Sequence, residues 1–292
     1  MQIPCPSGFE FTARKWVLGD RAKLLAVKDD QPTNLPKMMV QLAATGVVSP
    51  GPYSFKDSHL IDWDKVSMAD IAVANILIRA HTDDTILLQP MCRICRSLQR
   101  DPKAVNLLDM PIRMASQEGV DHLRTGAPVR REIDGAQVYL KAVRGMDLMV
   151  IGTLQAQEEE CIEEIQMCST IHEIHAAGKA EPIKALPELR EFYRAQSWEF
   201  QRGISAAIDE LFGGADMTYT FRCDHIECRS EQEQQLPLDH SFYGMGPTRK
   251  PVSLPTSSSG AKSVRELMRK PSSPSLPESP KSPDSTSQPE LK

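Results

Sequence analysis

QPMCRICRSL, residues 89–98, places two cysteines two residues apart. One tight turn at this spacing can direct both sulfur atoms at the same metal ion. A second pair of cysteines follows much later in RCDHIECRS, with four residues between its members. Both spacings lie within the range of zinc knuckles. We therefore expect one zinc-ribbon-like knuckle, made of residues 91–100 and 221–240, with the ligands Cys92, Cys95, Cys223 and Cys228.

Four thiolate ligands would complete a tetrahedral Zn²⁺ site and leave no position open for a substrate or water. The expected cofactor is therefore a structural zinc ion. Its binding would contribute on the order of 10 kcal/mol to folding. Because Cys95 and Cys223 are far apart in the sequence, the ion would also close a long loop of the chain.

Three alternatives to the four-cysteine site stay open. The two pairs could be free thiols in turns. His225, inside the second loop, could replace one cysteine as a ligand. A thioredoxin-like redox pair would need a strand, a CxxC motif and a helix in succession. Pro102 follows the first pair closely and no such unit is visible, so the redox role is disfavoured.

A zinc deaminase would show H-x-E followed by P-C-x-x-C. HTD at 81–83 and PMCRIC at 90–95 are superficially similar. However, Asp83 stands where glutamate is required, Met91 is inserted after the proline, and the histidine lies too close to the first cysteine. Nucleophile-elbow, Walker, dinucleotide-binding and HExxH motifs do not occur. We expect a protein that is not an enzyme.

The bulk composition is that of an ordinary globular protein. Of the 292 residues, 40% are hydrophobic and 25% are charged, and the net charge is -5. A chain without a basic surplus is not expected to bind nucleic acid or an anionic membrane surface. The N-terminus lacks the apolar core of a signal peptide, and no apolar run approaches the roughly 20 residues that span a bilayer. Seven cysteines without an export signal argue against a disulfide framework.

Two regions differ in composition. From Gly246 onward the chain has nine prolines, twelve serines and no aromatic residue. Such a segment buries too little apolar surface to offset its ordering entropy, so we expect residues 246–292 to form a disordered Ser/Pro-rich tail. Within it, SVRELMRK (263–270) could form a short helix that docks on a partner. Residues 1–245 are expected to form one globular domain.

The globular domain is expected to be α+β, with a mostly helical body. Apolar spacing and boundary residues predict helices over 35–46, 63–82, 155–175 and 187–214. Asp134-Gly135, flanked by alternating apolar residues, predicts a β-hairpin over 130–143. Alternation in MTYTFRC predicts a strand over 217–223.

A series of motifs, taken in order, is similar to a known family. It begins with PSG (6–8) and FTARKW (11–16), continues with SPGPYSF (49–55), IDWDKV (61–66) and DIAVANILIRAHT (70–82), and reaches MCRICRS (91–97). It then has IDG (133–135) leading into YLKAVRGMD (139–147), and closes with TFRCDHIECRSEQEQQLPLDHSFYGM (220–245). In this order the motifs resemble the baseplate hub assembly proteins of T-even-like tailed phages over about 240 residues. The chain departs from the family in its second cysteine pair, where C-x₂-C is commoner.

The resemblance implies a non-enzymatic structural or assembly protein of a phage tail baseplate or tail tip. Such a protein would be made in the host cytoplasm and be located in the virion tail. Its partners would be other tail or baseplate proteins, with the tape-measure protein as a further candidate. The alternative function is a tail assembly chaperone that binds the tape-measure protein. A zinc-dependent hydrolase or deaminase is the third hypothesis.

Overall fold

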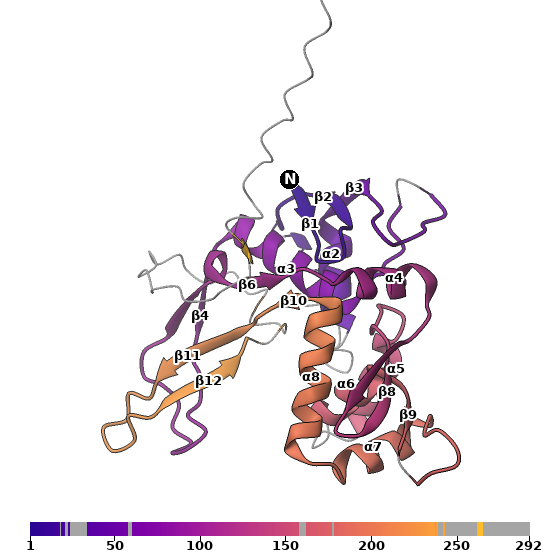
Figure 1. Ribbon diagram of the computed structural model, residues 1–292. Helices are drawn as coiled ribbons and strands as arrows, with labels where there is room; N and C mark the ends of the chain where they lie inside the picture. The colour runs from indigo at the N-terminus through magenta and orange to yellow at the C-terminus, as the bar shows by residue number, and fades with distance from the viewer. Residues whose placement is uncertain are drawn as a thin grey trace, which may run out of the picture.

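The computed structural model describes residues 1–17, 19–20, 23, 34–57, 60–157, 162–176, 178–236, 238, 242 and 262–264. Within these residues, seven α-helices are distributed among five small antiparallel sheets (Figure 1). The expectation of a mostly helical body is therefore wrong. Short strands pair with one another between the helices, and several of them lie in segments whose apolar spacing also fits a helix.

The N-terminal part combines one sheet with two helices. Its strands are β1 (Gln2–Pro4), β2 (Glu10–Ala13) and β3 (Ala44–Ser49), in the order β1-β2-β3. The helices are α2 (Leu35–Ala43) and α3 (Met68–Thr82), which pack against each other. The helix predicted over 35–46 is thus too long, because the β-branched sequence after Ala43 pairs with β2 instead.

Helix α3 is the central helix of the fold, because ten of its fifteen residues are buried. Its N-terminus is capped by Ser67, whose Oγ accepts a hydrogen bond from the Asp70 amide. The helix therefore begins at Met68, five residues later than the predicted boundary at 63. At the other end, the fully buried Arg79 donates to the carbonyl oxygen of Phe242 through Nε (3.1 Å) and pairs with Asp83.

The Asp70 carboxylate joins three segments that are distant in sequence. Ser7 donates to it through its backbone amide (3.1 Å) and its hydroxyl (2.6 Å), and Tyr53 donates through its hydroxyl (2.5 Å). Burial raises the pKa of Asp70, while these donors lower it. Gly51 lies beside this network at φ 56°, where a Cβ atom would be 2.6 Å from the Phe9 amide nitrogen. The PSG and SPGPYSF segments are therefore held against the first turn of α3.

A second group of elements is formed by β7 (Val129–Ile133), β8 (Ala136–Leu140), β9 (Ile171–His175) and the helices α4 (Gln117–Thr125), α5 (Leu148–Gln157), α6 (Ile162–Ser169), α7 (Leu186–Arg194) and α8 (Trp198–Phe212). The hairpin predicted over 130–143 is confirmed. β7 and β8 pair through the turn at Asp134 and Gly135, both of which have positive φ.

Two predicted helices in this region are wrong. The segment 155–175 contains the end of α5, the helix α6 and the strand β9, which pairs with β8 because Ile171 and Ile174 are buried there. The segment 187–214 is divided at Ser197, whose Oγ accepts a hydrogen bond from the Phe200 amide and caps α8. A cap inside a continuous apolar pattern is difficult to distinguish from an exposed helical serine.

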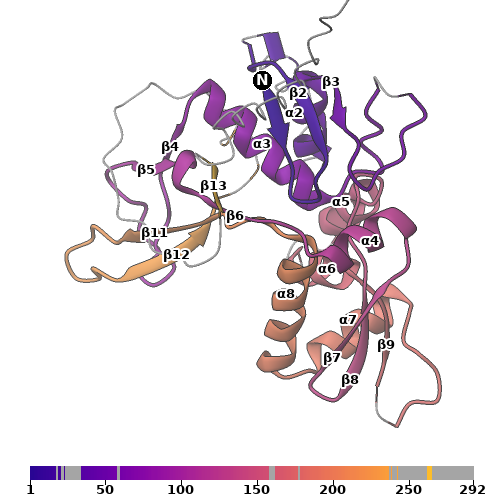
Figure 2. The ribbon, with the colours of Figure 1, turned by 45° about the horizontal axis from the view of Figure 1, so that its top comes forward.

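Two hairpins project together from the rest of the molecule (Figures 1 and 2). One consists of β4 (Thr85–Leu88) and β5 (Lys103–Asn106), which follow α3, and the short 3₁₀ helix η2 (Leu107–Asp109) comes after it. The other consists of β11 (Thr218–Arg222) and β12 (Glu231–Gln235). The strand predicted over 217–223 is thereby confirmed. We call residues 85–106 and 218–235 the knuckle arm.

The last sheet has the order β10-β6-β13, with β10 (Gly214–Ala215), β6 (Pro111–Arg113) and β13 (Lys262–Ser263). β13 belongs to the Ser/Pro-rich tail, and most of that tail lies outside the described residues. Its disorder and the boundary at 246 stay predictions. None of the helices in the described ranges combines the length and the apolar character that crossing a bilayer requires.

Candidate metal centre

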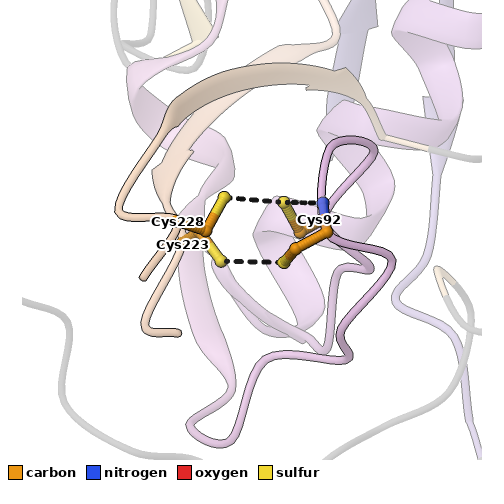
Figure 3. Close-up of side chains that lie close together, drawn as sticks. Cys92, Cys223 and Cys228 are labelled. Atoms are coloured by element: carbon orange, nitrogen blue, oxygen red, sulfur yellow. Dashed lines mark hydrogen bonds between the residues drawn. The ribbon is translucent and has the colours of Figure 1, made fainter. Parts of the chain in front are cut away.

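Each cysteine pair lies in the connection of one hairpin of the knuckle arm. Cys92 and Cys95 lie between β4 and β5, and Cys223 and Cys228 lie between β11 and β12. The two connections face each other and their sulfur atoms point into the space between them (Figure 3). Cys92 and Cys223 are buried, and Cys95 and Cys228 are half-buried.

The sulfur positions fit one tetrahedral ion. Sγ of Cys92 lies 3.7 Å from Sγ of Cys228, and Sγ of Cys95 lies 3.7 Å from Sγ of Cys223. All four sulfur atoms lie within 4.8 Å of one another. Ligands at ~2.3 Å from a tetrahedral zinc ion are ~3.8 Å apart, whereas a disulfide would require about 2.05 Å. The cluster can therefore hold a metal ion, and it is not a pair of disulfides.

Each turn is closed by backbone hydrogen bonds of the same kind. In the first, the Arg96 amide donates to the Cys92 carbonyl (2.8 Å) and the Cys92 amide donates to the Ser97 carbonyl (2.9 Å). In the second, the Arg229 amide donates to the His225 carbonyl (3.1 Å). The residue after each second cysteine has positive φ, 57° at Arg96 and 46° at Arg229. This left-handed residue turns the chain back toward the metal position.

Two glutamines complete the site, and the sequence analysis did not identify them. Gln232 Nε2 donates to Cys92 Sγ (2.7 Å), and the fully buried Gln99 donates through Nε2 to Cys223 Sγ (3.5 Å). Each glutamine lies four residues after the second cysteine of its own pair and reaches the first cysteine of the other pair. The side chain of Gln99 also accepts a hydrogen bond from the Asp224 amide (2.8 Å).

A repeated sequence could have revealed these positions. CRSLQ (95–99) and CRSEQ (228–232) share cysteine, arginine, serine and glutamine at the same places. In both copies the serine carbonyl accepts the amide of the first cysteine of the pair, Ser97 from Cys92 and Ser230 from Cys223. The two halves of the site are thus alike from the second cysteine onward. They differ in the length of the preceding turn, two residues against four.

The thiols have unlike acidities. Burial raises the pKa of Cys92, but hydrogen bonds from Cys95 and Gln232 outweigh this effect and lower the pKa to about 5. A hydrogen bond from Ser230 lowers the pKa of Cys228. The Gln99 hydrogen bond lowers the pKa of Cys223, but burial and the thiols of Cys95 and Cys92 raise it to about 11. Donors aimed at sulfur favour the thiolate form, which is the form that binds metal.

Among the described residues, neither His225 nor Asp83 belongs to the cluster of potential metal ligands. Among the described residues, the group of potential ligand atoms contains the four cysteines and does not include the exposed His225. Asp83, which takes the place of the deaminase glutamate, pairs with Arg79 at 3.3 Å. Cys5 and Cys168 are buried away from the cluster, and Cys161 lies outside the described residues.

Comparisons of the chain with family models, with curated proteins and with solved structures find no match.

Proposed function

We propose that the chain is a non-enzymatic structural or assembly protein of a phage tail baseplate or tail tip, whose shape is held by a structural Zn²⁺. The single observation that carries the metal part of this proposal is the convergence of four sulfur atoms from two hairpins to within 4.8 Å. The order of motifs shared with baseplate hub assembly proteins supports the phage part.

Zinc fits this donor set better than other common ions. Thiolates are soft ligands, and a tetrahedral arrangement of four sulfurs is typical of Zn²⁺ or of iron–sulfur centres. Zn²⁺ has no redox chemistry, and four cysteines are a common ligand set of structural zinc sites. Magnesium and calcium prefer oxygen ligands and do not fit.

A structural role is supported by the saturation of the site and by the composition of the arm. Four thiolates leave no coordination position for a substrate or an activated water. The β11–β12 hairpin has little apolar core of its own, because β12 is EQEQQ and Phe221 is the buried residue of β11. A metal ion that joins this hairpin to the β4–β5 connection would replace the missing hydrophobic burial.

The arm is also suited to docking on other tail proteins. Apolar side chains of both cysteine-bearing connections are exposed, with exposed fractions of 57% at Met91, 69% at Ile94, 55% at Leu98 and 73% at Ile226. Exposed apolar side chains gathered on a projecting element are typical of protein interfaces. Baseplate or tail proteins of the same particle are the proposed partners.

Mass spectrometry of purified particles of the phage that encodes the chain tests this function. Stoichiometric presence in the tail supports a baseplate component. Absence from particles, together with co-purification with the tape-measure protein from infected cells, would replace it with the chaperone function. Absence from both would overturn the phage assignment. A metal site with three protein ligands and a bound water would instead support a hydrolase or deaminase.

A further inference from the structure

Strand β6 lies in the middle of its small sheet and is paired along both edges. Gly214 and Ala215 of β10 pair with Arg113 and Ile112 on one edge. On the other edge, Lys262 and Ser263 of β13 pair antiparallel with Ile112 and Pro111. The second edge is thus occupied by a segment from the Ser/Pro-rich tail.

The residue after β13 fixes this segment. Val264 donates a backbone hydrogen bond to the Met110 carbonyl (3.2 Å), and its side chain is fully buried. Val264 belongs to the same hydrophobic cluster as Met110 and Ile112. The edge of β6 therefore recognises two residues of extended backbone followed by a β-branched apolar side chain. This is the pattern of strand addition to a sheet edge.

The contact is small and its two sides are far apart in the sequence. Residues 243–261 connect Lys262 to Phe242, the preceding described residue. A connection of 19 residues can span roughly 60 Å when extended. The segment 262–264 of a second copy presents the same backbone and the same valine to β6. Exchange between copies therefore keeps every contact at this edge.

We propose that the edge of β6 that pairs with β13 is a strand-acceptor site, and that it takes residues 262–264 of a second copy of this chain in place of its own. Two chains that exchange these segments form a closed dimer, because each edge is filled once and no acceptor remains. Exchange joins two chains and leaves the contacts at this edge unchanged. The share of the exchanged dimer therefore increases with protein concentration. This inference goes beyond the proposed function and does not require the metal.

Light scattering on the full chain over a series of concentrations tests the proposal. The wild-type mass should shift from 32.5 kDa toward twice that value as the concentration increases. Val264→Asp should abolish the shift, since a charged side chain cannot enter the buried position. Val252→Asp, the same change in the same tail but outside the described residues, should keep it. A wild-type chain that is monomeric at every concentration, or a Val264→Asp chain that associates equally well, would overturn the proposal.

A peptide competitor keeps the test valid if the Val264→Asp chain does not fold. A synthetic peptide of residues 259–268, SGAKSVRELM, should lower the average mass of the wild-type chain by filling the acceptor edge. The same peptide with Val264→Asp should have no effect. Equal effects of the two peptides would contradict the proposal. Zinc content measured on the same samples reports on the metal site separately, so failure of either idea can be recognised.

Discussion

Gln232 lies on one hairpin of the knuckle arm and donates a 2.7 Å hydrogen bond through Nε2 to the sulfur of Cys92 on the other. Gln99 makes the reciprocal contact with Cys223. Each half of the candidate metal centre thus supplies a donor to a ligand of the opposite half. These two hydrogen bonds join the hairpins and orient two of the four sulfur atoms.

Replacing Gln232 with alanine removes one of these donors and should weaken metal binding. Loss of a group that orients a ligand typically lowers metal affinity 10- to 100-fold. Competition with a chromophoric zinc chelator measures this change. Gln234→Ala is the matched control, because the Gln234 amide donates to the Met91 carbonyl and does not contact sulfur. Equal affinities of the two variants would contradict the assigned role of Gln232.

Replacing Cys92 with serine should release the metal and destabilise the arm. Three thiolates cannot close the site. The ion would no longer supply its folding free energy, which is on the order of 10 kcal/mol. Metal analysis and thermal unfolding report the two effects. Cys168→Ser alters a buried thiol outside the cluster, so that variant should keep its metal. Full metal content in the Cys92 variant would show that the ligand set is different.

Replacing Arg96 with glycine should stabilise the metal-loaded protein by up to about 1 kcal/mol. Arg96 has φ 57°, a conformation that costs a non-glycine residue roughly 1–2 kcal/mol, and glycine adopts it freely at some cost in unfolded-state entropy. Chemical denaturation measures the difference. Arg93 is not among the residues with positive φ, so Arg93→Gly should destabilise by about 0.5–1 kcal/mol. If both variants changed the free energy of unfolding in the same direction, this account of the turn would be contradicted.

His122 should make stability depend on pH. Its Nδ1 lies 2.6 Å from the Ala127 carbonyl and its Nε2 accepts a hydrogen bond from the Ala142 amide (3.0 Å), so the ring is neutral. Burial is the main cause that lowers its pKa below the unfolded value of about 6.5, and Arg144 and His172 also lower it. The unfolded state therefore binds more protons below pH 6.5. The stability from this group is present above pH 6.5 and is lost as the pH falls toward the folded pKa.

Unfolding free energies between pH 5 and pH 8 test this linkage. The wild-type value should fall with a slope of at most about 1.4 kcal/mol per pH unit from this histidine. His122→Asn should show a shallower slope, because the asparagine side chain does not titrate in this range. An unchanged slope in the His122 variant would exclude it as the responsible group.

The sequence was most informative where a feature depends on neighbouring residues alone. The spacing of Cys92 from Cys95 identifies a metal turn locally, and the Asp134-Gly135 turn defines a hairpin. Gln99 and Gln232 donate to sulfur atoms of the opposite hairpin, so their roles depend on the tertiary arrangement. The repeated CRSxQ sequence marks both positions but does not show which residues they contact. Helix positions were predicted better than helix ends, as the Ser197 cap shows.

The strands were the weakest part of the prediction for a physical reason. β3 and β9 lie directly after helices, and their apolar residues continue the helical spacing for several positions. The extended conformation of β3 and β9 becomes favourable through pairing with β2 and β8. Both partner strands are separated from them by other elements of the chain. The burial of Val264 also depends on a partner that is distant in sequence, because strand β6 lies about 150 residues earlier.

X-ray absorption spectroscopy and metal analysis of the freshly purified protein, prepared without chelators, test the central claim most directly. One zinc ion per chain with four sulfur neighbours at ~2.3 Å is the predicted result. A chain without stoichiometric metal, or an ion with oxygen or nitrogen among its nearest neighbours, would contradict it.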